Sequence, residues 1–194
     1  MAQELYTLEV RLLEGPVTDT FVERNPTVSR TIQVRGDQTL AQLHRAIFRA
    51  FGFWDDCHLY EFQFGEGPYD CSGGRYVVPS PVEFPFDVEP PPTGTVDKTR
   101  LCTLGLEVGR SFGYWYDFGD CWCFKLDIVA VGEAEPKRRY PRVIARTGES
   151  PPQYLEPDEG DDDEDEADLA AGALSGPELW CPPPADRPVG RGGP

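Results

Sequence analysis

The sequence predicts an α+β domain in which one main helix packs on a β-sheet and a hairpin lies at the centre of that sheet. A stripe of apolar residues at helical spacing runs from residue 40 to residue 51, and the runs around it alternate with the period of a strand. The stretch from Phe112 to Ile128 holds two alternating runs on either side of Asp117-Phe118-Gly119-Asp120, which is the pattern of a hairpin.

Two strands are predicted before the helix. Residues 5–13 and residues 28–34 both alternate, and the second run places Arg30 on its inward face. A guanidinium keeps its charge in a protein, so its burial requires a carboxylate or several carbonyl groups. If the hairpin is central, its turn residues Asp117 and Asp120 are the predicted ion-pair partners of Arg30.

The main helix is predicted to begin at Thr39, because Thr39 and Gln42 have the spacing of a capping box. Its apolar stripe consists of Leu40, Leu43, Ile47 and Phe51. His44 lies within about 40° of this stripe, so we expect its side chain to face the core. Gly52 is the predicted C-cap.

Shorter segments are predicted in the rest of the chain. A strand over residues 57–64 would place His58 on its inward face, and the hairpin run that follows the turn alternates from Trp122 onward. The remaining assignments are loops at 14–26 and 65–74, a short strand at 75–78, a proline-rich excursion at 79–95, a short helix within 97–107 and an edge strand at 140–145.

Charge is unevenly distributed along the chain. The net charge is −16, and residues 158–194 hold eleven acidic and two basic side chains. Such a segment repels itself and has little apolar area to bury. We therefore expect a folded domain over residues 1–157 and an acidic, Pro- and Gly-rich disordered tail over residues 158–194. A nucleic-acid backbone requires a basic surface, so this composition disfavours nucleic acid as a partner.

The cellular setting follows from what the sequence lacks. The N-terminus has no secretory signal pattern and no run of about 18 apolar residues occurs, so we expect a cytoplasmic protein with reduced thiols and no membrane partner. Cys121 and Cys123 share a strand face. A structural zinc site normally combines two Cys or His pairs, so we expect ordinary thiols, no metal site and no cofactor.

Three segments, in order, resemble one family. They are the helix pattern Thr39-Leu40-x-x-Leu43-His44, the strand His58-Leu59-Tyr60-Glu61-Phe62 and the turn Tyr116-Asp117-Phe118-Gly119-Asp120-x-Trp122. Together they resemble the Ri-plasmid open-reading-frame-three-like family, over about residues 4–154. The resemblance implies an α+β fold with a mixed sheet. It also implies a link to mobile genetic elements, because such genes accompany transposon passenger genes, but it implies little about activity.

The chain departs from the family pattern in two places. The family usually has His two residues after the Trp, where this chain has Phe124. A later Pro-Pro-Glu-Asp-Cys-Gly-Gly segment of the family appears here only as Pro151-Pro152-Gln153-Tyr154. Any activity that depends on those polar residues in relatives would be absent from this chain.

Four residues are candidates for catalysis. Asp117 and Asp120 flank the hairpin turn, and His44 and His58 are predicted to point inward from other elements. Carboxylates with His can bind a metal or transfer protons, so a metal-assisted hydrolase or nuclease-like enzyme is one alternative. The simpler interpretation is that the two Asp side chains cap the turn.

A soluble binding or interaction module is the leading expectation, ahead of an enzyme. The candidate binding residues, each of which also has a structural explanation, are Arg30, Tyr116, Asp117, Asp120 and Trp122. A protein partner would dock on the acidic tail or on an exposed aromatic such as Trp54 or Trp115. A nucleic-acid-binding protein that stacks bases on its aromatics is the second alternative, and the lack of a basic patch disfavours it.

Overall fold

The computed structural model describes residues 3–79 and 91–154. The strands are β1 (Glu4–Glu14), β2 (Ser29–Arg35), β3 (Tyr60–Gln63), β4 (Arg75–Val77), β5 (Gly94–Thr95), β6 (Ser111–Tyr116), β7 (Trp122–Glu133) and β8 (Arg142–Thr147). The helices are α1 (Asp19–Arg24), α2 (Leu40–Phe51) and a single 3-10 turn, η1 (Leu101–Thr103). The predicted tail, residues 158–194, lies outside the described residues, as does most of the proline-rich excursion.

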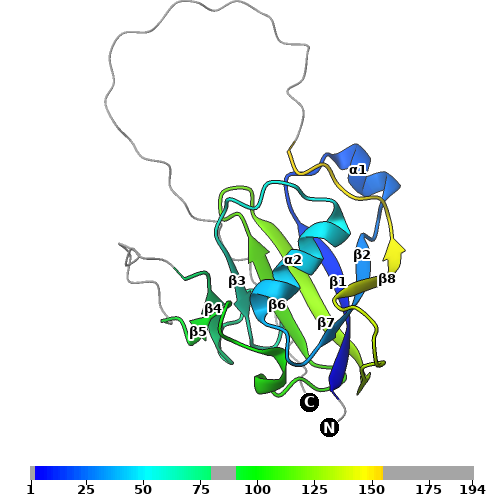
Figure 1. The fold of residues 1–194 in the computed structure, drawn as a ribbon. Helices are drawn as coiled ribbons and strands as arrows, with labels where there is room; N and C mark the ends of the chain where they lie inside the picture. The colour runs from blue at the N-terminus through cyan, green and yellow to red at the C-terminus, as the bar shows by residue number, and fades with distance from the viewer. Residues whose placement is uncertain (1–2, 80–90, 155–194) are drawn as a thin grey trace, which may run out of the picture.

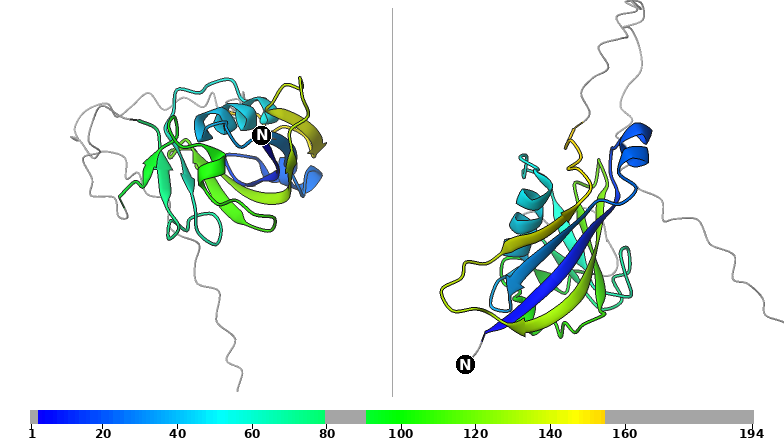
Figure 2. Two further views of the ribbon diagram at one scale, coloured as in Figure 1. Left: turned by 60° about the horizontal axis from the view of Figure 1, so that its bottom comes forward. Right: turned by 90° about the vertical axis from the view of Figure 1, so that its right-hand side faces the viewer.

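One sheet contains all eight of these strands, in the order β5-β4-β3-β6-β7-β1-β2-β8. The long strands β1 and β7 lie side by side near its centre (Figure 2). β4 and β5 pair in parallel and the other neighbours pair antiparallel, so the sheet is mixed. α2 lies across one face (Figure 1). The predicted α+β class, the mixed sheet and the single main helix are confirmed.

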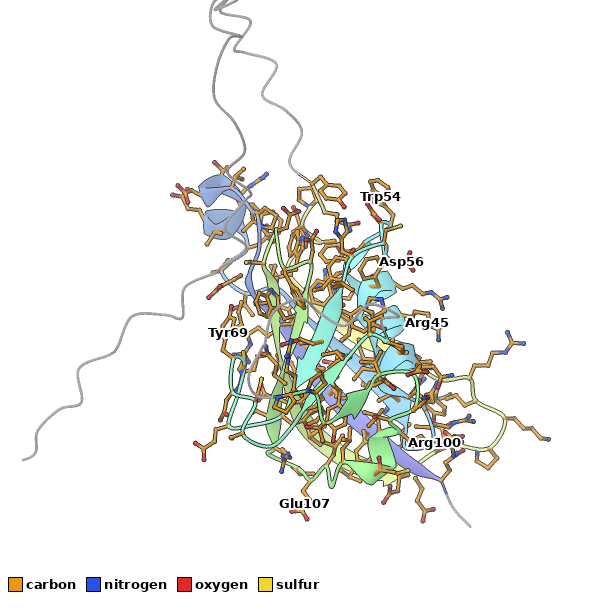
Figure 3. All side chains as sticks on the ribbon, turned by 90° about the vertical axis from the view of Figure 1, so that its left-hand side faces the viewer. Arg45, Trp54, Asp56, Tyr69, Arg100 and Glu107 are labelled. Carbon is orange, nitrogen blue, oxygen red and sulfur yellow. The ribbon has the colours of Figure 1, made fainter. Side chains whose placement is uncertain are left out.

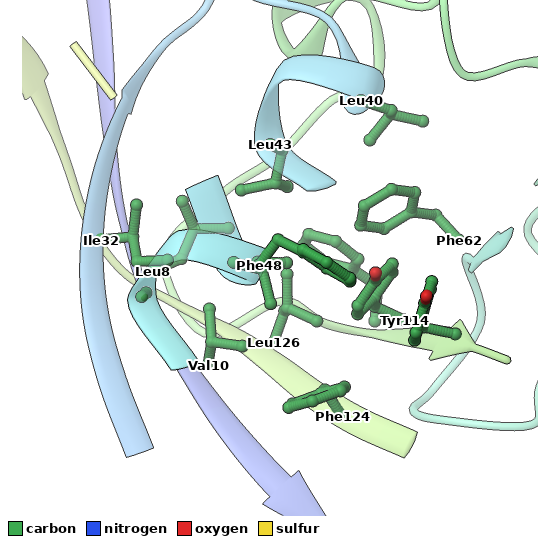
Figure 4. Close-up of a cluster of buried hydrophobic side chains, with 14 of the residues drawn as sticks. Leu8, Val10, Ile32, Leu40, Leu43, Phe48, Phe62, Tyr114, Phe124 and Leu126 are labelled. Atoms are coloured by element: carbon green, nitrogen blue, oxygen red, sulfur yellow. The ribbon is translucent and has the colours of Figure 1, made fainter. Parts of the chain in front are cut away.

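The core lies between α2 and the inward face of the sheet (Figure 4). Leu43 and Ile47 of α2 are fully buried against the sheet. Leu8 of β1 and Leu126 of β7 are fully buried on the side of the sheet that faces α2. The outward face of β1 and β7 carries polar side chains instead, including the ion pair of Lys125 with Asp127 at 2.8 Å. This segregation is what the period of two in the strands predicts.

The ends of α2 follow the predicted signals. Thr39 Oγ1 accepts a hydrogen bond from Gln42 N at 3.3 Å, and Gln42 Oε1 accepts one from Thr39 N at 2.9 Å. At the other end Gly52 has a φ of 80°, the left-handed conformation that ends many helices. The helix therefore begins and ends where local side-chain chemistry sets it.

Several shorter assignments are wrong. Residues 14–26 contain α1, whose N-cap Thr18 accepts from Phe21 N at 3.2 Å, so a local capping signal was present but the helix is too short to show a stripe. Residues 97–107 hold only η1. β3 begins at Tyr60, so His58 precedes the strand and is exposed rather than inward.

The thiol prediction fails at one position. Cys57, Cys71, Cys102 and Cys123 are free, but Cys121 is disulfide-bonded. Cys121 ends the β6–β7 turn with a partly exposed side chain, whereas Cys123 is buried in β7. Among the described residues, no helix is long and apolar enough to cross a membrane.

Candidate functional site

The turn between β6 and β7 is built around Asp117. Its φ is 51°, in the left-handed region that Asp and Asn tolerate better than most residues. Asp117 Oδ1 accepts from the backbone N–H of Gly119 at 3.1 Å and of Asp120 at 3.4 Å. The side chain of Asp117 therefore caps the turn, as the simpler interpretation of the sequence predicts for this residue, whereas Asp120 takes part through its backbone N–H.

The second carboxylate oxygen of Asp117 faces a histidine. His58 Nδ1 lies 3.3 Å from Asp117 Oδ2, and His58 Nε2 lies 3.2 Å from the hydroxyl of Tyr154. That hydroxyl donates to Asp55 Oδ2 at 2.8 Å. The four side chains form one chain of polar contacts that joins the turn to the segments before β3 and after β8.

Gln153 fixes the backbone of this region. Its Oε1 accepts from Trp54 N at 2.9 Å and Asp55 N at 3.0 Å, while its Nε2 donates to Asp55 O at 2.7 Å. The hydroxyl of Tyr116 donates to the same Asp55 carbonyl. Gln153 is buried, so these bonds hold residues 54 and 55 in one conformation in a place where water competes little for them.

The electrostatics of the site are dominated by carboxylates. A hydrogen bond from the Cys57 backbone N–H, together with one from Tyr154, lowers the pKa of Asp55. Burial and the neighbouring charge of Asp117 raise the pKa of Asp120. Burial and the hydrogen bond to Asp55 raise the pKa of Tyr154 to about 12, so this phenol stays protonated at neutral pH. The site thus concentrates negative charge.

An exposed tryptophan stands next to this cluster. The side chain of Trp54 is 74% exposed, although its ring meets that of Tyr154 edge to face at a centroid distance of 5.7 Å. Figure 3 shows Trp54 and Asp56 at the same end of the molecule. A large apolar ring in water beside several carboxylates is the least expected feature of this surface.

His44 lies elsewhere, inside the core. Its Nδ1 is 2.7 Å from the hydroxyl of Tyr114, and its ring stacks on that of Tyr60 at 3.8 Å. Burial, with a smaller effect of Arg45, lowers the pKa of His44 to about 3, so the imidazole is neutral. The structure does not bring His44 together with His58, Asp117 and Asp120.

The predicted ion pair of Arg30 with Asp117 or Asp120 is wrong. Arg30 is inward and only 1% exposed, as expected, and its guanidinium also lies 4.8 Å from the ring centre of Phe51. Its hydrogen-bond acceptors are Ala50 O, Ser29 O, Thr147 O, Gly148 O and Ser150 Oγ. The start of β2, the end of α2, and the end of β8 with the segment after it supply these oxygens, and the hairpin turn does not.

Two other predicted binding residues occupy core positions. Trp122 is fully buried and packs on Phe53 at a centroid distance of 4.7 Å. The ring of Tyr116 is buried as well, and its hydroxyl donates a hydrogen bond to the Asp55 carbonyl. Of the predicted site residues, only His58, Asp117 and Asp120 lie together near the surface.

The residues that complete the site are far apart in sequence. Trp54 and Asp55 follow α2, whereas Gln153 and Tyr154 lie about a hundred positions later. No local pattern indicates that these segments meet. In the described part of the chain, no group of three His, Cys, Asp or Glu side chains is arranged to hold a metal ion.

Similar sequences and structures were found. A family model described as plasmid pRiA4b ORF-3-like protein matches residues 19–158. A relative named uncharacterized protein y4hQ, from Sinorhizobium fredii (strain NBRC 101917 / NGR234), is 30% identical over 135 residues, which make up 66% of this chain and 59% of the relative. The chain thus spans about three fifths of that relative.

A solved structure has a similar fold. It is the crystal structure of a protein of unknown function, MM3350, from Methanosarcina mazei Go1, with a TM-score of 0.56 and 22% sequence identity. The match covers 75% of this chain and 71% of that one. At this identity the likeness concerns the fold alone.

Proposed function

The chain belongs to the plasmid pRiA4b ORF-3-like family, and within it we propose that this protein is a binding module that docks a basic segment of a partner protein on the surface around Trp54. One observation carries the proposal: Trp54 is 74% exposed although its backbone is held by the buried Gln153. A rigid, exposed aromatic loses little conformational entropy on binding, which is why tryptophan dominates many interfaces.

The carboxylates around Trp54 favour a partner segment with positive charge. Asp55 and Asp56 follow it directly, Asp117 lies 3.3 Å from His58, and Asp120 lies near enough to both for their charges to shift its pKa. An arginine or lysine of the partner would stack its cation on the indole and approach these carboxylates at the same time. It would also offset the charge repulsion that contributes to the raised pKa of Asp120.

A defined peptide tests the proposal. A ten-residue peptide of alternating Arg and Ser is titrated into the full-length protein and its heat of binding is measured. Trp54→Ala should weaken binding at least tenfold, which is about 1.4 kcal/mol. The matched control is Trp180→Ala, which removes the tryptophan that follows the acidic run. Equal affinities of both variants and the unmodified protein would reject Trp54 as the docking residue.

One observation favours the hydrolase alternative. Asp117 orients the His58 ring from its Nδ1 side at 3.3 Å, as a carboxylate does for many general bases. Tyr154 occupies the other ring nitrogen, so a substrate would have to displace its hydroxyl. Hydrolysis of p-nitrophenyl acetate that disappears in His58→Gln but persists in Trp54→Ala would support this alternative.

The link to mobile genetic elements stays a prediction.

A further inference from the structure

A pocket of about 420 Å³ lies between the exposed side of α2 and β8 with the segment before it. Four arginines line it: Arg45 and Arg49 from the helix, and Arg142 and Arg146 from the strand. They come from two elements whose mutual packing no local sequence pattern indicates. The pocket shares no residue with the site around Trp54, so its function does not depend on the proposal above.

The pocket is rich in hydrogen-bond donors. Arg45 Nε donates a hydrogen bond to Ala41 O at 3.3 Å, and Arg142 Nε donates one to Gln33 Oε1 at 2.8 Å. The terminal nitrogens of both guanidinium groups therefore remain available to donate to a ligand. Gln42 turns its oxygen toward the backbone N–H of Thr39, so its amide N–H groups remain free to donate. The lining thus offers mainly N–H groups.

Among the residues that the structure describes, no acidic side chain lines the pocket. Some arginines outside the pocket are ion-paired, as Arg75 is with Glu61 at 2.6 Å and Arg35 with Asp37 at 3.0 Å. Within the described residues, none of the four pocket arginines has a carboxylate within 4.0 Å. Burial, with a smaller effect of the positive charge of Arg146, lowers the pKa of the neighbouring Arg30. A concave surface therefore holds four uncompensated cations in a protein whose net charge is −16.

From this geometry we propose that the pocket binds a small organic anion with at least two phosphate or carboxylate groups. Guanidinium groups bind both oxyanions in pairs of parallel hydrogen bonds, and several of them on one site match more than one charged group. The volume lies in the range of small-molecule sites, about 300–1,000 Å³. The ring of Tyr140, with Arg142 above it at 5.8 Å, adds an apolar wall for an organic part.

A small ligand fits better than a nucleic acid. The arginines converge on one hollow and do not form a stripe that could follow a phosphate backbone. The net charge of −16 repels a long polyanion as a whole. A small anion in the pocket lies within about 8 Å of the guanidinium groups, inside the screening length of physiological salt, and is attracted by them.

Calorimetric titration of the full-length protein with pyrophosphate and with citrate, at one fixed ionic strength, tests the proposal. We expect saturable binding of at least one probe. A preference for pyrophosphate assigns a phosphorylated ligand, and a preference for citrate assigns a polycarboxylate. The double variant Arg49→Gln/Arg146→Gln should bind at least tenfold more weakly. Its matched control, Arg24→Gln/Arg110→Gln, removes the same charge from residues that do not line the pocket.

A second measurement does not depend on substitutions. Phenylglyoxal modifies accessible arginines, and peptide mass mapping reports which ones. The preferred probe should protect the four pocket arginines and leave Arg24 unprotected. Absence of saturable binding to both probes, equal weakening in the two double variants, or uniform protection of all arginines would each overturn the proposal.

Discussion

Arg30 and His44 are both buried basic residues, and the core accommodates them in opposite ways. Arg30 cannot lose its proton, so backbone carbonyls and one hydroxyl surround its nitrogen atoms. His44 can, and burial lowers its pKa to about 3, so the imidazole stays neutral beside Tyr114. Only His44 changes its protonation state between neutral and acidic pH, so we expect His44 to make stability depend on pH and Arg30 not to do so.

His44 should make the fold sensitive to mild acid. Below about pH 6.5 the unfolded chain binds a proton at this residue, whereas the folded protein does so only near pH 3. The unfolded state therefore binds more protons, and stability falls as the pH drops from 6.5 toward 3. At pH 5 the loss is about 2 kcal/mol as an upper value. Urea unfolding at pH 7.5 and pH 5 measures it.

The variant that checks this is His44→Phe. It should be less stable at pH 7.5 but should lose less stability between pH 7.5 and pH 5. His58→Gln is the control, because it removes the other histidine of the chain. If His44→Phe and the unmodified protein have the same slope with pH, His44 is not the responsible group.

Arg30→Met should destabilise the protein by about 2–4 kcal/mol, because it leaves several buried carbonyl groups without a donor. Since no turn carboxylate pairs with Arg30, its effect should add to that of Asp120→Asn within about 0.5 kcal/mol. Chemical unfolding of the single and double variants measures this. A double variant whose loss of stability differs strongly from the sum of the two single losses would support an ion pair between Arg30 and Asp120, which the structure contradicts.

At the scale of an element, the β6–β7 turn depends on the side chain of Asp117. Asp117→Ala removes the cap of Gly119 and Asp120 and keeps a Cβ at a φ of 51°, so it should cost about 1–2 kcal/mol. Asp117→Asn keeps an oxygen for the cap and tolerates this conformation, so it should cost less than half as much. Thermal unfolding compares the two. A loss as large for Asn as for Ala would show that the charge facing His58 matters more than the cap.

At the scale of the whole molecule, we expect residues 1–157 to fold without the acidic segment, residues 158–194. Its composition offers little apolar surface, so removing residues 158–194 should change the free energy of unfolding by less than about 1 kcal/mol. Because Cys121 is disulfide-bonded, the full-length and the shortened protein should be compared in reducing buffer. Cys121 is then a thiol in both proteins, and the difference in stability reports non-covalent contacts alone. A larger loss under reduction would mean that the segment docks on the domain.

Local patterns in the sequence determined the elements that carry strong periodicity or caps. The stripe and capping box of α2, the alternation of β1 and β7 and the turn at Asp117 all involve residues within a few positions of each other. Alternation also showed that Arg30 faces inward. These features depend on backbone geometry, which short stretches of sequence specify.

Only the tertiary structure decided which side chains meet. Arg30 bonds to Thr147, His58 to Tyr154 and Trp54 to Gln153, pairs about a hundred positions apart. The arginine pocket likewise exists only because α2 packs beside β8. Periodicity reports the face on which a residue lies, but the group opposite it is set by the packing of whole elements. For that reason the sequence determined the class of the fold, its main helix and Trp54 as a candidate docking residue, whereas the groups around Trp54 and the whole arginine pocket emerged from the folded chain.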